Sequence, residues 1–571
     1  MYRSMRRFAL VSACASLLLL AGCGRKTVED TAPLSFAPAD TPYLYANFKP
    51  LPDDVRQAMN KRTFALMQYS AASYKRMAQV LAANNPDLAR VLDEVATEMA
   101  GIKTPQQLEQ TTGFSQQAHF AFYGIGLAPV ARVELANPDA FRGLLARIEK
   151  SIGQPFAVAK LDNQDYWNIG GAGDKLHLLL AIEPNKQLVA TLAPANADPA
   201  LLKQLLGLSK PEHSAAARLS DIDGARGYSD YGSGYLDLPK LLARLSDAKD
   251  PVTLAYAAAL GAPAPSSDPS CPAEFASIGA QIPLASFGVE QFEADHIRAS
   301  LDVSLSAPLR GMLANLKQPV PGMAASPDGA LFDFVLALPL EKVRAFWQAR
   351  AQAVAAQPYK CPTLASLNEG FKSMAATLQA QLPPQVSSLL GVRVVLDQLV
   401  LGSSPAAPTQ FAARLQVAST DPNALLQLAQ KNLPQLAITD VKADDKPIAV
   451  TLPPQLQSLG GGASQGWIAA DQHSIGVAVG KDEDAKLASM LTADAGDGSG
   501  LVRMHFDGKL YDTFADFSDS MIARMPPAMQ PQLQQQGAMM RLYAKWLRSV
   551  DSKVTLDDEG MHMQLDMALA Q

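Results

Sequence analysis

Hydrophobic and polar residues alternate along several short stretches of the chain, and between those stretches apolar residues recur at helical spacing. Alternation predicts strands at Tyr43–Phe48 and Val130–Leu135. Helical spacing predicts a helix from Asp53 to Asn84, which Asn85-Pro86 ends. The strands have one apolar face and the helices one apolar stripe each. The pattern therefore predicts an α+β fold, a largely antiparallel sheet with helices packed on one face.

The order of these elements returns in the second half of the chain. Ala131–Ala136 leads into Asn137-Pro138, and Ala413–Ala418 leads into Asp421-Pro422, so both predict a strand, an Asx-Pro cap and a helix. Tyr235-Leu236-Asp237 before one helix corresponds to His505-Phe506-Asp507 before another. The sequence therefore predicts a tandem duplication, with repeat 1 at 41–310 and repeat 2 at 311–571.

The N-terminus has a pattern of its own. Arg3, Arg6 and Arg7 precede an apolar run from Phe8 to Leu20, which is typical of a secretory signal. Leu20-Ala21-Gly22-Cys23 closes the run and resembles the lipobox of bacterial lipoproteins. That resemblance implies a signal peptide at 1–22, which type II signal peptidase removes. It also implies that Cys23 carries a diacylglycerol thioether and an N-acyl group such as palmitate.

These features predict where the protein resides. Residues 23–40 are expected to form the lipidated cysteine and a short tether. In enterobacterial lipoproteins an aspartate after the cysteine retains the protein in the inner membrane, so Gly24 favours the outer membrane, with the body facing the periplasm. No apolar run after Cys23 approaches the ~20 residues that a membrane-spanning helix needs. We therefore expect the lipid alone to hold the protein at the membrane.

Charge and cysteine count narrow the class of protein further. The chain has a net charge of −6, which makes a nucleic acid an unsuitable partner. Cys14 leaves with the signal and Cys23 carries lipid, so Cys271 and Cys361 remain. In an oxidising compartment this pair favours one structural disulfide. Two buried free thiols are the alternative, and a redox role lacks a Cys-x-x-Cys motif.

Candidate catalytic and metal-binding residues have simpler structural interpretations. Gly462-Ala463-Ser464-Gln465-Gly466 fits a nucleophile elbow, but the surrounding pattern predicts strands, so a hairpin turn is preferred. His505 and His562, with Asp507 and Asp566 beside them, would form a surface His/Asp cluster if their strands were neighbours. A solvated sheet face is the preferred interpretation. No catalytic, cofactor-binding or metal-binding residue is assigned.

The C-terminal part is rich in methionine. Met521, Met525 and Met529 recur at helical spacing before a second group at Met561, Met563 and Met567. Packing in a core is the preferred role for these flexible side chains. An apolar groove for a lipid or a peptide is the functional alternative at this helical end.

Together these patterns predict a non-enzymatic, lipid-anchored protein of the cell envelope whose duplicated body serves binding or scaffolding. Its expected partners are the membrane, through the lipid on Cys23, and another envelope protein or a hydrophobic ligand. A carrier of lipid or of another hydrophobic ligand is the alternative. A hydrolase with an unfamiliar site is a third hypothesis.

Overall fold

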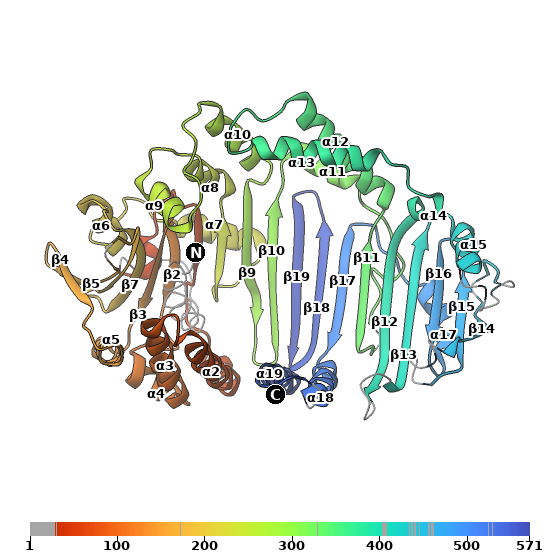
Figure 1. Cartoon of the computed structure of the whole chain (residues 1–571), viewed down its shortest axis with the longest axis horizontal. Coiled ribbons are helices and arrows are strands. Elements are labelled where there is room, and N and C mark those ends of the chain that lie inside the picture. The colour runs from red at the N-terminus through yellow and green to blue at the C-terminus, as the bar shows by residue number, and fades with distance from the viewer. Residues whose placement is uncertain are drawn as a thin grey trace. The chain divides into compact units, whose positions relative to one another are not determined.

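The chain folds into two compact units. The computed structural model describes residue 29 and residues 31–570, apart from residues 172, 328, 402–407, 433, 435–437, 439–440, 445, 455–456, 458–461, 523–524 and 528. Unit 1 comprises Met1–Ala294 with Lys360–Leu364, and unit 2 comprises Asp295–Tyr359 with Ala365–Gln571 (Figure 1). The predicted signal peptide and Cys23 lie outside the described residues.

Unit 1 contains an antiparallel sheet whose strands run in the spatial order β4-β5-β6-β7-β3-β2-β1-β8-β9. Its strands are β1 (Tyr43–Ala46), β2 (Phe120–Ile125), β3 (Ala128–Glu134), β4 (Ala157–Leu161), β5 (Gln164–Ile169), β6 (Leu176–Ile182), β7 (Gln187–Pro194), β8 (Ser233–Leu236) and β9 (Leu284–Phe292). The order places the first strand of the chain near the middle of the sheet, so later strands are added on both sides of it.

Helices of unit 1 connect these strands, and several begin with an Asx-Pro cap. They are η1 (Pro33–Phe36), α2 (Asp53–Leu81), α3 (Pro86–Gly101), α4 (Pro105–Thr112), α5 (Pro138–Ile152), α6 (Pro199–Leu206), α7 (Ala216–Arg226), α8 (Leu238–Leu245), α9 (Pro251–Leu260) and α10 (Ser270–Gly279). The side chains of Asn85, Asn137 and Asp198 each accept a hydrogen bond from a backbone N–H of the first turn. A proline follows each of them at the first helical position, where a backbone N–H would have no partner within the helix.

The sheet of unit 1 is packed on both faces around β6, while Phe122 of β2 is 38% exposed on the face that carries Tyr45. Leu178 and Leu180 of β6 lie in a hydrophobic cluster with side chains of α2, α4 and α5. Leu179 and Ala181, which point to the opposite face, lie in a second cluster with η1, α6, α7 and α9. The continuous apolar run of β6 accounts for this arrangement, because a strand without alternation buries both faces. Helices thus cover more of this sheet than the single face expected from the sequence.

Unit 2 contains a second antiparallel sheet, with the order β10-β19-β18-β17-β11-β12-β13-β16-β15-β14. Its strands are β10 (His296–Ser304), β11 (Phe332–Ala337), β12 (Leu389–Leu401), β13 (Pro408–Ser419), β14 (Ile448–Thr451), β15 (Gln465–Ala470), β16 (Ser474–Val479), β17 (Gly500–Asp507), β18 (Leu547–Leu556) and β19 (Gly560–Leu569). Again the first strand after the repeat boundary, β11, lies near the middle.

Helices of unit 2 lie mainly at the two ends of its strands. They are α11 (Ala307–Ala314), α12 (Leu340–Ala356), α13 (Ala365–Gln379), α14 (Pro384–Ser387), α15 (Pro422–Asn432), α17 (Glu483–Leu491), α18 (Lys509–Ile522) and α19 (Gln530–Trp546). In Figure 1, α12 and α13 lie across one end of β10 and β17–β19, and α18 and α19 lie at the other end of these strands. The stretch of sheet between them is seen without a helix in front of it.

The two sheets have the same strand order, which confirms the predicted duplication. Unit 1 contains β5-β6-β7-β3-β2-β1-β8-β9 where unit 2 contains β14-β15-β16-β13-β12-β11-β17-β18, and the strands correspond in chain order as well. The α+β class and the antiparallel sheets are also as predicted. β10, which lies within the predicted repeat 1, belongs to unit 2, where it pairs with β19 along its whole length. The repeat boundaries, 41–310 and 311–571, stay a prediction, because the two units divide the chain at other residues.

The expected tether is partly folded. Leu34 and Ala37, which the sequence places between the lipidated cysteine and the body, belong to the core of unit 1. Phe36 lies under the guanidinium of Arg132, with its ring centre 3.7 Å from the central carbon. Pro33–Phe36 form a short turn of 3-10 helix. Leu34 of this turn is buried in the core, and Phe36 packs against the core. Residues 33–37 therefore extend the folded body toward the N-terminus.

Candidate functional site

An apolar sheet face in unit 2 is open, and we call it the open face. Residues that are directly paired across antiparallel strands have their side chains on the same face of the sheet. Phe334 of β11 is paired with Met504 of β17 and with Val394 of β12, so these three apolar side chains lie on one face. The same pairing continues through β18, β19 and β10 on one side and β13 and β16 on the other. The open face consists of Ile297, Leu301, Val303, Phe332, Phe334, Leu336, Val392, Val394, Leu396, Leu415, Val417, Val477, Val502, Met504, Phe506, Val550, Val554, Met561, Met563, Leu565 and Met567.

None of these open-face side chains is buried. They are half-buried, and Leu415, Val477 and Met563 are 39%, 39% and 37% exposed. One polar side chain, Ser552 of β18, lies among these apolar residues, and its neighbours on the adjacent strands are Met504 and Leu565. Soluble proteins rarely leave contiguous apolar patches of this extent uncovered, and such patches mark binding surfaces.

The opposite face of the same strands is charged and buried. Asp333 of β11 is fully buried and accepts hydrogen bonds from Arg393 of β12, at 3.1 and 2.9 Å, and from Arg503 of β17, at 2.5 Å. Arg503 also donates to the carbonyl oxygen of Gly322, at 3.0 Å. Two guanidinium groups around one carboxylate satisfy its lone pairs, which offsets part of the cost of burying the charges.

Gly322 belongs to the loop that covers this charged group. A Cβ at residue 322 would lie 2.5 Å from Nη1 of Arg393, and its backbone has a φ of 88°, which favours glycine. Val320 and Met323 of the same loop are buried against Val335. At β11, β12 and β17 the charged face of the sheet is therefore covered while the apolar face is open, whereas on β18 the polar face carries exposed Lys553 and partly exposed Asp551.

Helices border the open face at two places. α15 covers Ile468 and Ala470 at the β15 and β16 side through Leu426. At the β17 side, Tyr511 of α18 packs on Phe506 with ring centres 4.6 Å apart, and Tyr543 of α19 packs on Tyr511 at 5.4 Å. The open face is thus limited to β10–β13, β17–β19 and the adjoining part of β16.

The α18–α19 hairpin holds an apolar cavity of about 240 Å³. It is lined by Phe514, Phe517, Ser518, Met521, Met525, Leu533, Gln536 and Met540. Met521, Met525 and Met540 are thus the methionines that line this cavity, while the groove for a lipid or a peptide stays a hypothesis. Met561, Met563 and Met567 belong to the open face and are not in a core, because the pairing of β19 with β10 and β18 turns them to the uncovered side.

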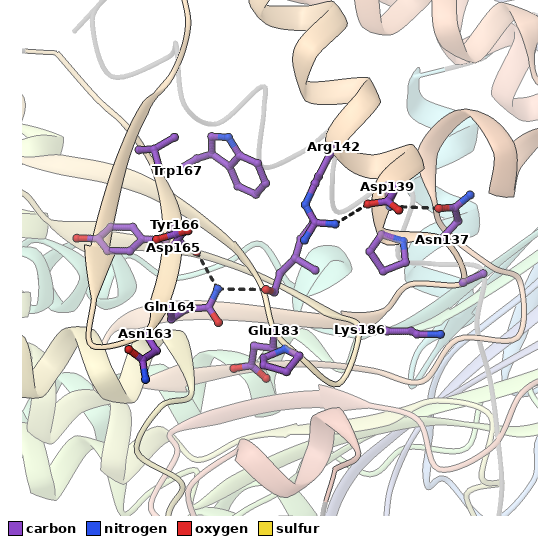
Figure 2. Close-up of a pocket in the computed structure, with 15 residues that line it drawn as sticks. Asn137, Asp139, Arg142, Asn163, Gln164, Asp165, Tyr166, Trp167, Glu183 and Lys186 are labelled. Carbon is purple, nitrogen blue, oxygen red and sulfur yellow. Dashed lines mark hydrogen bonds and ion pairs between the residues drawn. The ribbon is translucent and has the colours of Figure 1, made fainter.

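Unit 1 has a polar cleft of about 810 Å³ formed by the β4–β5 hairpin, the start of α5 and the β6–β7 turn. In the view of Figure 2, Trp167 and Arg142 lie above Glu183 and Lys186. Arg142 pairs with Asp139 at 2.8 Å, and Arg132 donates to Glu183 at 3.2 Å from beneath the cleft. Burial raises the pKa of Glu183 above its ordinary value.

This cleft is suited to hydrogen-bonding a polar molecule. Its carboxylates already have cationic partners: Asp139 has Arg142, Glu183 has Arg132, and Asp165 has Lys160 at 3.7 Å. The cleft thus presents carboxylate and cationic side chains, already paired with one another, to solvent.

Cys271 and Cys361 form a disulfide, with an S–S distance of 2.05 Å across a sequence separation of 90. Both residues are buried. Glu274 on α10 accepts hydrogen bonds from the backbone N–H groups of Lys360 and Cys361, at 2.8 and 3.0 Å. The pair predicted from cysteine usage is thus a covalent staple with additional hydrogen bonds beside it.

Ser464 does not occupy a nucleophile elbow. It is exposed in the loop that precedes β15, and a strand follows it where the elbow requires a helix. The structural interpretation preferred from the sequence, a turn between strands, fits the loop joining β14 to β15.

His296, His505 and His562 each pair with an aspartate. Nδ1 of His505 lies 2.8 Å from Asp551, and Nδ1 of His562 lies 2.8 Å from Asp302. Asp566 instead pairs with His296, at 2.6 Å, and with Arg298. The cluster considered from the sequence does not form, because β18 lies between β17 and β19. Within the described residues, no group of three or more His, Cys, Asp or Glu side chains is placed to hold a metal ion.

Asp223 of α7 is a buried acid that the sequence did not single out. Burial raises its pKa from 3.8 to about 7. It lies beside Ser233 of β8, and the negative charge of nearby Asp230 raises its pKa further. Unit 1 therefore holds a carboxyl group that titrates near neutral pH.

Sequence analysis also missed the open face. The signal was present in the strand patterns, where Asp333, Arg393 and Arg503 occupy one parity and Phe334, Val394 and Met504 the other. Alternation shows which residues share a face, but it does not show which face is covered. The usual assumption that the apolar face is covered fails here.

Comparisons with known proteins give no family. No family model and no curated protein matches the sequence. Crystal form III of TP0453 is 12% identical over 51% of this chain and 88% of that chain, with a TM-score of 0.24. Crystal form IV of TP0453 is 13% identical over 49% and 83%, with a TM-score of 0.23. At these TM-scores the similarity does not establish a common fold.

Membrane-spanning helices were sought as well. None of the helices in the described part of the chain combines the length and the apolar composition needed to cross a bilayer.

Proposed function

We propose that this protein is a non-enzymatic, lipid-anchored protein of the cell envelope that binds the acyl chains of a lipid on the open face of unit 2. The observation that carries the proposal is the contrast between the two faces of β11, β12 and β17. Asp333 and its two arginines are buried on one face, while the apolar rows that include Phe334 and Met563 are uncovered on the other. Leaving such rows in water is unfavourable by roughly 25 cal/mol for each Å² of apolar surface, so a ligand that covers them is bound favourably.

The chemistry of the open face favours acyl chains over a protein partner. Protein interfaces contain about one hydrogen bond per 100–200 Å² and a polar rim. The open face has Ser552 as the interruption in its rows and otherwise offers aliphatic, methionine and phenylalanine side chains. An acyl chain needs no hydrogen bond, and each methylene it buries contributes about 0.8 kcal/mol. Methionine side chains adjust their shape to such flexible ligands.

The apolar cavity of the α18–α19 hairpin supports the same class of ligand. It lies within unit 2, and its lining includes Phe517, Met521 and Met540. Ligand sites are usually concave and mostly apolar, with few polar groups. This cavity would accept the apolar end of an acyl chain that lies on the open face.

The lipobox supports the envelope location. Leu20-Ala21-Gly22-Cys23 would fix the protein to a membrane through lipid on Cys23, with Gly24 favouring the outer membrane. An anchored protein with an acyl-binding face would accept, hold or present lipid close to its own membrane. The alternative from the sequence, a carrier of a hydrophobic ligand, thus becomes the preferred form of the binding role. Replacing Cys23 with alanine should move the protein out of the membrane fraction, and unchanged membrane association would refute the anchor.

The binding proposal is tested with a secreted form that starts after Cys23 and a fluorescent fatty acid. Leu415→Asp and Val394→Asp place charges on the open face, and we expect each to weaken binding at least tenfold. Val158→Asp is the matched control, because Val158 is a strand residue of unit 1 that is 63% exposed and does not belong to the open face. Its affinity should equal that of the parent. Equal affinity in all forms, or no binding by the parent, would contradict the proposal.

A further inference from the structure

The polar cleft of unit 1 brings an aromatic ring together with hydrogen-bonding side chains, and the proposed acyl-binding role does not use it. Its volume of about 810 Å³ lies within the range of roughly 300–1,000 Å³ that is usual for ligand sites. All of the residues that line it belong to unit 1. The cleft is therefore large enough to hold a ligand of its own.

Trp167 of β5 forms the aromatic wall of this cleft. It is paired with Leu180 of β6, so both side chains lie on the same face of the sheet. The half-buried indole packs against the cluster that contains Leu180 and Phe141, and it also lines the cleft. In Figure 2, Trp167 is carried by a strand on one side of the cleft, and Asp139 and Arg142 are carried by α5 on the other. The core thus holds the ring in place while part of it faces the cleft.

Unused hydrogen-bond donors line the cleft with this ring. Within the described part of the chain, the side-chain amide of Asn163, Nζ of Lys186 and Nε1 of Trp167 have no hydrogen-bond partner. Arg142 donates to Asp139 at 2.8 Å through Nη1, which leaves most of its N–H groups for another acceptor. The cleft therefore offers donors from two turns, a strand and a helix.

Unused acceptors are present as well. The side chain of Asp165 is 69% exposed, and Lys160 approaches it only to 3.7 Å, so its carboxylate keeps lone pairs for further donors. Gln164 donates through Nε2 to the carbonyl oxygens of Asp165 and Ile182, at 2.7 and 3.1 Å, and its Oε1 stays available. A hydroxyl group both donates and accepts, so a ligand with many hydroxyl groups uses both sets.

The charges around the cleft nearly balance. The carboxylates of Asp139, Asp165 and Glu183 stand against the cationic side chains of Arg142 and Lys186. A strongly anionic ligand would meet the carboxylates, and a strongly cationic ligand would meet Arg142 and Lys186. The arrangement therefore favours a neutral ligand.

The turns that border the cleft have unusual backbone angles. Asp162, between β4 and β5, has a φ of 52°, and Lys186, between β6 and β7, has a φ of 63°. Within the described residues, Asp482 is the third non-glycine residue with a positive φ. Such residues are energetically costly and cluster at ligand sites. Two of the three thus lie at this cleft, beside Asn163 and at Lys186 itself.

The polar cleft is not a necessary consequence of the duplicated fold. Asn137-Pro138 begins α5, and Asp421-Pro422 begins the corresponding α15. Arg142 lies as far after the first pair as Leu426 lies after the second. Leu426 is buried in an apolar cluster with Ile468. The same fold can therefore fill this position with an apolar side chain, and unit 1 has a cation there instead.

We propose that the polar cleft of unit 1 binds a neutral oligosaccharide, with one sugar ring lying on the indole of Trp167. The C–H groups on the face of a sugar ring are slightly positive and the face of an aromatic ring is negative, so the two attract each other. The hydroxyl groups of the sugar would accept from Asn163 and Arg142 and donate to Asp165. This site stands separately from acyl-chain binding, because the open face belongs to unit 2.

The test measures the binding of cellopentaose, chitopentaose and maltopentaose to the full chain that starts after Cys23, by isothermal titration calorimetry. We expect at least one of them to bind and Trp167→Ala to weaken that binding at least tenfold. Trp167→Phe keeps a ring and should bring the affinity back to within about threefold of the parent. Trp347→Ala is the matched control, because Trp347 is a 42% exposed tryptophan of unit 2, and it should leave the affinity unchanged within twofold.

A second variant avoids a change in the core, against which Trp167 packs. Asn163→Ala/Asp165→Ala alters two exposed side chains and should weaken binding at least fivefold without changing the urea midpoint. No binding of any of the three oligosaccharides, or binding that Trp167→Ala and the double variant leave unchanged, would overturn the proposal. Inorganic phosphate and tri-alanine test other ligand classes. Binding of either that the double variant abolishes, with none of the oligosaccharides binding, would also overturn the proposal.

Discussion

Units 1 and 2 have the same strand order but cover their sheets differently. In unit 1, side chains such as Phe64 and Leu108 from the helices after β1 fill one face of the sheet, and α6, α7 and α9 fill the other. In unit 2 the helices after β11 lie at the strand ends, and Phe334 and Val394 stay half-buried (Figure 1). The helices that follow the first strand thus pack on the sheet in unit 1, whereas in unit 2 they leave the apolar face of the equivalent strand open.

The charged residues follow the same division. Unit 1 has a buried ion pair between Arg132 and Glu183 beside apolar clusters on both faces of its sheet. Unit 2 gathers Asp333, Arg393 and Arg503 on its covered face. Because the charged side chains at the centre of the unit 2 sheet are covered, the apolar side chains of the same strands lie on its exposed face.

The largest expected effect comes from breaking the buried charge group of unit 2. Asp333→Ala would leave Arg393 and Arg503 buried without their shared carboxylate, and we expect a loss of roughly 3–5 kcal/mol in the free energy of unfolding. Urea unfolding followed by circular dichroism measures it. A loss below ~1 kcal/mol would show that the covered face of unit 2 is more accessible to water than its burial indicates.

A matched pair of truncations compares the two apolar faces. Phe120 of unit 1 is 3% exposed, so Phe120→Ala should cost roughly 3–5 kcal/mol of stability. Phe334 of unit 2 is half-buried, so Phe334→Ala should cost ~1 kcal/mol while weakening fatty-acid binding. Thermal and urea unfolding of both variants provide the comparison. Equal losses would mean that the face of unit 2 is covered as well.

The smallest effect concerns pH. Asp223 titrates at about 7 in the folded protein against 3.8 ordinarily. Between these values the folded state keeps a proton that the unfolded state has released, so stability is full below about pH 4 and falls as the pH rises through about 7. Asp223→Asn should therefore stabilise the protein at pH 8 and leave its stability nearly unchanged at pH 4, as measured by urea unfolding.

This pH dependence belongs to unit 1. α7, which carries Asp223, has no counterpart in residues 492–499, the stretch that joins α17 to β17 in unit 2. If Asp223→Asn stabilised the protein equally at both pH values, the burial of the carboxyl group would not be the cause.

Much of the fold could be predicted from the sequence. The Asx-Pro pairs at Asn137 and Asp421 cap helices as expected, because the side-chain oxygen and the following proline act locally. The duplication followed from the order of such local signals. The disulfide followed from counting cysteines in an oxidising compartment.

The candidate site could not be predicted in the same way. Alternation in Phe332–Ala337 gives the two faces of β11, but which face is covered depends on where α12 and the loop around Gly322 pack. Partners of the histidines depend on which strands are neighbours, so His505 meets Asp551 and not a residue of β19. These are long-range properties, which the local sequence pattern does not contain.

The most direct test of the open face is photo-crosslinking with a diazirine fatty acid, followed by peptide mass spectrometry. We predict that labels will be found on peptides of β11–β13 and β17–β19, including Leu415 and Met563, and that unlabelled fatty acid will compete them away. Labels confined to unit 1, or labels that competitor does not displace, would contradict the claim that unit 2 binds acyl chains on its open face.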